Sequence, residues 1–147
     1  MLSARSALQE MLGILRSDSP VAFFRLMEEL GSIKVDIQVG SERFSVRGKG
    51  NRIVVDEAES DPQVCLRTDR HTILALIDGS RSMLDAVLAC ELSLSADAAL
   101  LGRVGRAGAA FGDGAIRARR ARGVLDEFRK SSAAQDLGIG QSRRSIM

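Results

Sequence analysis

The segment that decides the fold runs from residue 61 to residue 97 and reads DPQVCLRTDRHTILALIDGSRSMLDAVLACELSLSAD. It predicts four elements in order, namely a strand at 63–66, a helix capped by Thr68 or Asp69 and ended by Gly79, a short helix at 82–89 and a strand at 91–96. The two helices carry more apolar side chains than they need to cover one small sheet. Their apolar faces lack the polar residues that usually perform catalysis. This surplus indicates an apolar interior rather than a reactive site.

Two amphipathic helices are expected near the start of the chain. Leucine and methionine residues spaced by three and four positions predict a helix over residues 4–16. Ser19 is a suitable N-cap for a second helix because Pro20 fits its first position, where a missing N–H costs nothing. Gly31 ends this second helix. Both helices need a surface on which to lie.

A strand meander supplies that surface. Apolar and polar residues alternate over 33–39, and short glycine turns lead to further strands around 44–46 and 53–55. After the fifth strand, Asp97 caps a longer helix, which Gly112 and Gly114 are expected to interrupt, and a last helix runs near 115–130. The fold class is therefore α+β, with an approximately five-stranded, mainly antiparallel sheet and helices packed on one face. One domain is expected over residues 1–130, with extra N- and C-terminal helices and a disordered tail at 131–147.

Composition narrows the function classes. The chain of 147 residues carries a net charge of +2, which is too small to indicate a nucleic-acid partner. Cys65 and Cys90 each fall in a predicted strand and, with one histidine and no CxxC, form no zinc site. Buried free thiols fit a reducing compartment, and no apolar run reaches the roughly 20 residues that span a bilayer. We expect a cytoplasmic protein without metal or cofactor.

Candidate catalytic residues are few. His71 is the single imidazole and lies in the first turn of a helix, where a solvated or capping role is expected rather than a general base. Neighbouring carboxylates such as Glu28 and Glu29 point to different faces of a helix, so they form no acid–base pair. We therefore expect no enzymatic activity.

Two further patterns leave alternatives open. Arg117, Arg119 and Arg122 belong to a basic stretch that fits contact with anionic lipid headgroups, with nucleic acid or with a partner, or a solvated helix face. Glycines recur every three residues at positions 102, 105 and 108. Each glycine lowers the stability of a helix by up to about 1 kcal/mol relative to alanine. We therefore expect the glycines to allow another group to come close to this helix face: a packed helix, a partner subunit or a ligand chain. A lid loosened by the following glycines is the other interpretation.

The order of elements resembles the sterol carrier protein 2 (SCP2-like) lipid-binding family over about residues 20–112. The matching segments are Val64-Cys65-Leu66-Arg67-Thr68, then ILALIDG from residue 73, the short apolar helix after Ser82, and the strand leading into Asp97. The earlier sheet, with Phe44-Ser45-Val46 and Gly50-Asn51-Arg52-Ile53, is also similar. The chain departs from the family at Ala89, Cys90 and Ala96, where glycines are usual.

The resemblance implies an apolar tunnel for a fatty acyl, sterol or isoprenoid-quinone-like chain. Its lining would come from inward positions of the helices and last strand: Leu74, Ile77, Met83, Val87, Leu92, Leu94, Leu101, Val104 and Phe111. The alternative is plain core, which gives an interaction or accessory module with the same fold and a filled interior. Partners expected from these interpretations are a hydrophobic small molecule, an anionic membrane surface to which the protein binds peripherally, a partner protein or a second copy of the chain.

Overall fold

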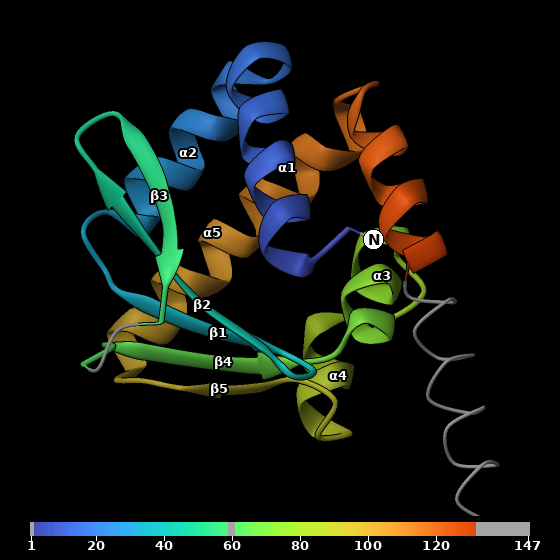
Figure 1. The fold of residues 1–147 in the computed structure, drawn as a ribbon. Helices are drawn as coiled ribbons and strands as arrows, with labels where there is room; N and C mark the ends of the chain where they lie inside the picture. Colours follow the sequence, from blue (N-terminus) through green and yellow to red (C-terminus); the bar gives the residue numbers. More distant parts are fainter. Residues whose placement is uncertain (1, 59–60, 132–147) are drawn as a thin grey trace, which may run out of the picture.

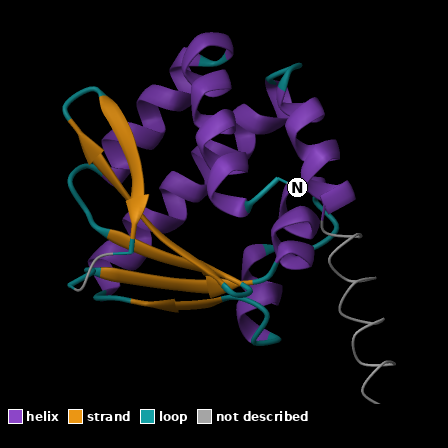
Figure 2. Cartoon of the chain, in the orientation of Figure 1, coloured by secondary structure: helices purple, strands orange, loops and turns teal. Residues whose placement is uncertain are grey.

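The computed structural model describes residues 2–58 and 61–131, and its helices lie together on one side of a sheet (Figures 1 and 2). The tail predicted at 131–147 lies outside the described residues, except that Ser131 is the last described residue of a helix. The α+β fold class predicted from the sequence is confirmed.

Two helices begin the chain, α1 (Ala4–Asp18) and α2 (Pro20–Leu30). Ser3 caps α1 because its hydroxyl accepts a hydrogen bond from the backbone N–H of Ser6. Pro20 occupies the first turn of α2 as predicted, although the Ser19 side chain makes no capping hydrogen bond. Gly31 ends α2 with a positive φ of 53°, which glycine adopts without a steric penalty.

The sheet has the strand order β3-β2-β1-β4-β5. Its strands are β1 (Val35–Val39), β2 (Glu42–Lys49), β3 (Arg52–Glu57), β4 (Val64–Thr68) and β5 (Ser93–Ser95). Three neighbouring pairs are antiparallel, and β1 and β4 pair in parallel. The parallel pair arises because the chain leaves β3 at one edge and returns on the opposite side of β1. The sheet is therefore mixed but mostly antiparallel.

Strand register aligns apolar side chains into rows that face the helices. Val64, Val35, Val46 and Val55 lie opposite one another across four strands, and all four are buried. The next row on this face joins Leu94, Leu66, Ile37 and Phe44. Side chains two residues apart on a strand share a face, so these rows provide one continuous apolar surface.

Two short helices connect β4 with β5, α3 (Arg70–Asp78) and α4 (Met83–Leu88). Asp69 is the N-cap of α3 and accepts a hydrogen bond from the backbone N–H of Thr72 at 2.8 Å. Gly79 ends α3 in the left-handed conformation, and the Ser82 hydroxyl caps α4. These starts and stops agree with the sequence pattern. β5 is shorter than the strand predicted at 91–96.

The C-terminal helices differ from the prediction. α5 (Ala98–Arg117) runs without interruption through Gly112 and Gly114. The helical conformation then stops at residues 118–120, and a last helix follows at 121–131. Gly114 is required by packing: a Cβ there would lie 2.6 Å from Cδ2 of Leu15 and 2.9 Å from Cβ of Ala22. This glycine allows α5 to approach α1 and α2 closely and does not loosen the helix.

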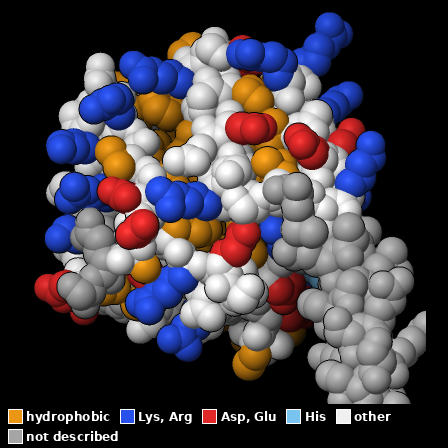
Figure 3. Space-filling view, in the orientation of Figure 1, with side chains coloured by type: hydrophobic (Ala, Val, Ile, Leu, Met, Phe, Trp, Pro, Cys, Tyr) orange, Lys and Arg blue, Asp and Glu red, His pale blue; other side chains and the backbone are white. Residues whose placement is uncertain are grey.

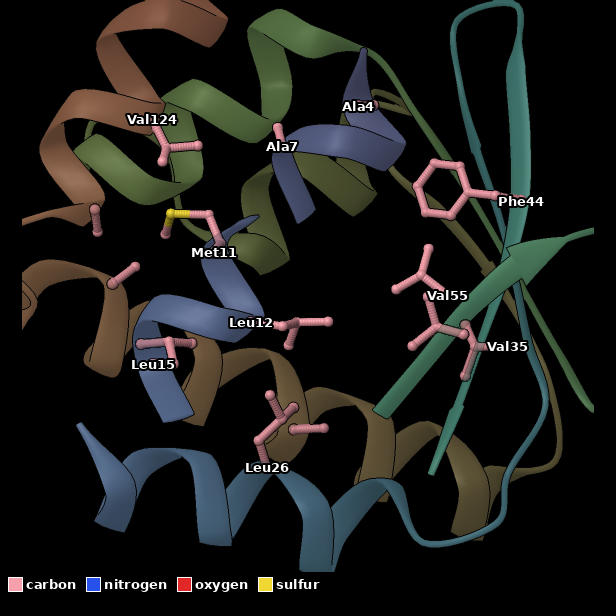
Figure 4. Packing of buried hydrophobic residues seen from close by; sticks show 14 of the residues in the cluster. Ala4, Ala7, Met11, Leu12, Leu15, Leu26, Val35, Phe44, Val55 and Val124 are labelled. Atoms are coloured by element: carbon pink, nitrogen blue, oxygen red, sulfur yellow. The ribbon is translucent and has the colours of Figure 1, made fainter. Parts of the chain in front are cut away.

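The core lies between the sheet and the helices (Figure 4). Phe44 and Val55 point from the sheet toward α1, and Leu12 and Leu26 point toward them from α1 and α2. Leu15 is fully buried where the three long helices meet. The helix face that Leu12 and Leu15 share thus holds the N-terminal helices on the sheet, which the amphipathic spacing predicted.

Candidate functional site

Two adjoining cavities lie between the sheet and the helices. The first, about 210 Å³, is partly open and is bordered mainly by α1, α3, the last helix and the strands β1, β2 and β4. The second, about 270 Å³, is also partly open and is bordered mainly by α1, α2, α5 and all five strands. Both are lined almost wholly by carbon, and no ionisable side chain lines either of them in the described residues. The walls of both cavities are therefore almost wholly apolar.

Five side chains belong to the walls of both cavities: Leu8, Ile37, Leu66, Met83 and Phe111. Ile37 and Leu66 form the floor because they lie side by side in the second apolar row of the sheet. Met83 is 40% exposed at the start of α4. Met83 and Phe111 line both cavities, and the unbranched methionine side chain adapts its shape more easily than most core residues. Together the cavities reach the size of small-molecule sites, about 300–1,000 Å³.

The residues predicted to line a tunnel fall into four groups in the structure. Ile77 and Leu92 line the first cavity; Leu94, Leu101 and Val104 line the second; Met83 and Phe111 line both. Leu74 and Val87 line neither cavity. Leu74 is buried in the core, whereas Val87 is 42% exposed because α4 buries Ala86 instead.

The sequence interpretation missed the contribution of α1 and of the last helix. Leu8 and Met11 of α1 line the first cavity, as do Val124, Leu125 and Phe128 of the last helix. Their amphipathic spacing predicted the two helices, but it cannot show what a helix faces. Both helices lie outside the segment that resembles the SCP2-like family, so the resemblance did not point to them either.

The glycines at 102, 105 and 108 face different surroundings. Gly105 and Gly108 line the second cavity. A Cβ at Gly105 would meet nothing within 4 Å, and one at Gly108 would lie 3.5 Å from Cε of Met83. Gly102 faces the side chain of Arg106. Close helix packing is therefore found at Gly114, while Gly105 keeps the cavity wall free of side chains.

The basic stretch does not form one helical face. Arg117 ends α5 and pairs with Asp113 at 3.6 Å, Arg119 lies in the turn, and Arg122 lies on the last helix. All three arginines are exposed. On the face seen in Figure 3, basic side chains are spread over much of the surface with acidic ones between them. The last helix, which was expected near 115–130, begins only at residue 121, so Arg119 and Arg122 do not lie on one helix.

Other arginines of this stretch hold the helices together. Arg103 donates to the carbonyl of Glu29 at 3.0 Å and so satisfies the end of α2. Arg120 binds both carboxylate oxygens of Asp18 and links the α1–α2 turn to the turn after α5. The hydrogen bond from Arg120 lowers the pKa of Asp18, and the same contact raises the pKa of Arg120. These contacts are structural.

The two cysteines lie on β4 and in a turn, and the histidine lies on α3. Cys65 is half-buried in β4, but Cys90 is exposed in a turn and has a positive φ of 61°. The prediction that Cys90 is buried in a strand is wrong, because β5 begins only at Ser93. His71 follows the first residue of α3, as expected. The described residues contain no cluster of histidine, cysteine or carboxylate side chains that could hold a metal ion.

Comparisons with known proteins identify the fold. No protein-family model matches the chain, and no curated protein sequence does. Solved structures do match: a "UbiJ-SCP2 Ubiquinone synthesis protein" has a TM-score of 0.53 and 14% identity, over 69% of this chain and 85% of that one. The sterol carrier protein domain 2 of Helicoverpa armigera has a TM-score of 0.50 and 15% identity, over 72% and 89%. The chain has an SCP2-like fold.

A further structural match is the stereoselective sec-alkylsulfatase Pisa1 from Pseudomonas, with a TM-score of 0.45 and 11% identity. It covers 64% of this chain but only 16% of the enzyme. The structural neighbours are thus mainly SCP2 and SCP2-like domains, as the order of elements suggested. Within residues 2–58 and 61–131, no helix is both long and apolar enough to cross a bilayer.

Proposed function

We propose that this protein binds and carries a hydrophobic molecule, such as a fatty acyl, sterol or isoprenoid-quinone-like chain, without catalysing its conversion. The observation that carries the proposal is the pair of adjoining cavities lined by carbon. Transfer of apolar ligand surface from water into such a space contributes about 25 cal/mol per Å². The SCP2-like fold, which is shared with proteins named as sterol carriers, supports the same class of ligand.

The volume of the cavities gives a second argument. Empty apolar volume in a core costs about 24 cal/mol per Å³. For volumes of about 210 and 270 Å³, this cost is at most about 5 and 6.5 kcal/mol, because both cavities are partly open to solvent. A domain has only about 5–15 kcal/mol of stability in total. A ligand that fills this space therefore stabilises the fold, because it removes the cost of the empty volume.

Native mass spectrometry of the protein purified from cells tests the proposal. We expect a mass shift for a bound molecule that organic extraction removes and identifies. The extracted protein should then take up the neutral fluorophore N-phenyl-1-naphthylamine with enhanced fluorescence. Protein that carries no lipid from cells and also fails to take up the fluorophore would contradict the proposal.

An interaction module is the second candidate function. The observation that favours it is the exposed apolar side of α4, where Leu84 is 67% exposed and Leu88 is 73% exposed. Exposed leucines close together on one helix are typical of binding surfaces. The double change of Leu84 and Leu88 to Ser should abolish capture of a partner protein or self-association while leaving fluorophore uptake intact. Loss of uptake with unchanged association would reject this candidate.

The exposed arginines are proposed to contact an anionic surface. Each arginine near such a surface contributes about 1 kcal/mol. Replacing Arg117, Arg119 and Arg122 together by Ala should therefore weaken sedimentation with phosphatidylserine vesicles about a hundredfold or more at low salt. Arg129→Ala is the matched control, because Arg129 is engaged with Asp78 at 2.9 Å. Equal vesicle binding by the triple variant and the control would reject the headgroup role.

A further inference from the structure

One buried arginine lies beside the first cavity. Arg70, the first residue of α3, is 8% exposed. Its Nη2 atom donates to Oε1 of Glu42 at 3.4 Å, and its Cζ atom lies 4.7 Å from the centre of the Phe128 ring. Its Nη1 atom is buried and has no hydrogen-bond partner. A buried donor without a partner is rare in folded proteins and calls for an explanation.

The neighbours of Arg70 place it at the cavity wall. Phe128, whose ring contacts the guanidinium, lines the first cavity. Glu42 accepts a hydrogen bond at 2.6 Å from the backbone N–H of Ala4, which also lines this cavity. Thr68, two residues before Arg70, lines it too, while its hydroxyl donates to the carbonyl of Glu91. The guanidinium thus lies against the Phe128 ring, which separates it from the cavity that this ring lines.

The charges of Arg70 and Glu42 indicate which ligand group Nη1 of Arg70 would bind. Glu42 already provides the negative charge that opposes Arg70, so a second carboxylate would meet the repulsion of Glu42. The vacant donor on Arg70 is its Nη1 atom, which carries two N–H groups and has no hydrogen-bond partner. An uncharged oxygen with a free lone pair satisfies that donor and adds no charge to the site. Ester, ketone and quinone carbonyls and hydroxyl groups all provide such an oxygen.

We infer that Arg70 is the polar anchor of the cavity, and that the ligand is a long apolar molecule bearing an uncharged oxygen acceptor at one end. This inference rests on the proposed function and narrows its ligand class, because it disfavours free fatty acids. The head group reaches Nη1 when the Phe128 ring turns aside, and the apolar chain extends toward Met83 and the second cavity. Binding then removes the cost of the unpaired donor, which an empty cavity leaves in place.

Competition against N-phenyl-1-naphthylamine tests the anchor with three ligands of equal chain length: hexadecane, methyl hexadecanoate and hexadecanoate. The natural protein should bind the methyl ester about tenfold to a hundredfold more tightly than hexadecane, as expected for one hydrogen bond to a charged donor. Arg70→Met should bind both equally. In Glu42→Gln, the guanidinium loses its counter-charge, so the preference should move from the ester to hexadecanoate. Arg129→Met, next to Phe128 in sequence and exposed, should keep the natural preference.

The outcomes separate the inference from the proposed function. If the fluorophore and all three ligands fail to bind the natural protein, both are wrong. If the ligands bind but the ester has no advantage over hexadecane, or if Arg70→Met retains that advantage, the anchor is wrong and the carrier function stands. If the natural protein prefers hexadecanoate to the ester, the inference that the ligand has an uncharged head group is wrong. If Arg70→Met does not fold, the preference of Glu42→Gln between the ester and hexadecanoate tests the contact between Arg70 and Glu42 independently.

Discussion

Gly105 gives the sharpest test of whether the second cavity holds a ligand. It lies on α5, lines this cavity, and would place a Cβ in open space with nothing within 4 Å. Gly105→Leu therefore introduces four carbons into the cavity without an overlap at Cβ. A larger side chain fits at this position, because the space for it is already present. At most core positions a larger side chain would overlap its neighbours.

The expected magnitudes follow from helix propensity and burial. Replacing a helix glycine by leucine contributes about 0.8 kcal/mol to stability at either of two positions, Gly105 or Gly112. Gly112 is also on α5 with nothing within 4 Å of its Cβ position, but it lines neither cavity. Only Gly105→Leu adds the burial of a leucine side chain, about 1.5–3 kcal/mol. Its melting temperature should exceed that of Gly112→Leu by roughly 3–10 °C.

Ligand affinity should move in the opposite direction. Four carbons of side chain displace about four carbons of ligand, and each buried methylene contributes about 0.8 kcal/mol. Gly105→Leu should therefore weaken binding of a long-chain ligand about a hundredfold, while Gly112→Leu leaves it unchanged. Thermal unfolding by circular dichroism and titration with N-phenyl-1-naphthylamine measure the two effects. If Gly105→Leu is more stable than the control but binds equally well, the ligand does not use the second cavity. If it is less stable than the control, the reasoning about empty space at Gly105 is refuted.

Three further predictions concern stability and reactivity. Gly114→Ala places a methyl group against α1 and α2 and should lower the free energy of unfolding by about 1–3 kcal/mol in urea titrations, whereas an unchanged or higher value contradicts the close helix packing. Because Arg120 lowers the pKa of Asp18, that contact stabilises the fold at neutral pH and is lost as pH falls through the lowered pKa. Asp18→Asn should therefore be less stable than the natural chain at pH 7 but equal to it in acid well below about pH 4, and a difference that persists in acid refutes the linkage. Cys90 is exposed and Cys65 half-buried, so Cys90→Ser should remove the fast phase of labelling by a thiol reagent and Cys65→Ser the slow one.

Local signals were enough to predict much of the fold. Asp69, Gly79 and Ser82 act through their nearest neighbours in sequence, so the bounds of α3 and α4 follow from the residues themselves. Alternation of apolar and polar residues likewise predicted the strands. Gly112 and Gly114 misled the interpretation because a glycine in a helix has two meanings. It weakens the helix, or it permits close contact with another element, and only the position of Leu15 shows which meaning applies to Gly114.

The candidate site depended on contacts that the sequence does not contain. Val87 was chosen for its position on an apolar helix, yet α4 turns Ala86 inward instead. Leu8 and Phe128 were assigned to helices outside the family-like segment, yet both line the first cavity. A helix pattern determines which face is apolar and leaves open which surface that face contacts.

The sequence by itself determined the elements, their order and the apolar character of the interior, because caps, turns and periodicity act over a few residues. The tertiary structure decided where the apolar surplus of residues 61–97 is used. Parallel pairing of β1 with β4 brings Ile37 beside Leu66, and the helices close over this row without filling it. It also decided that Arg70 is buried beside Glu42 with its Nη1 atom unpaired, because those residues are 28 positions apart and meet only in the folded chain.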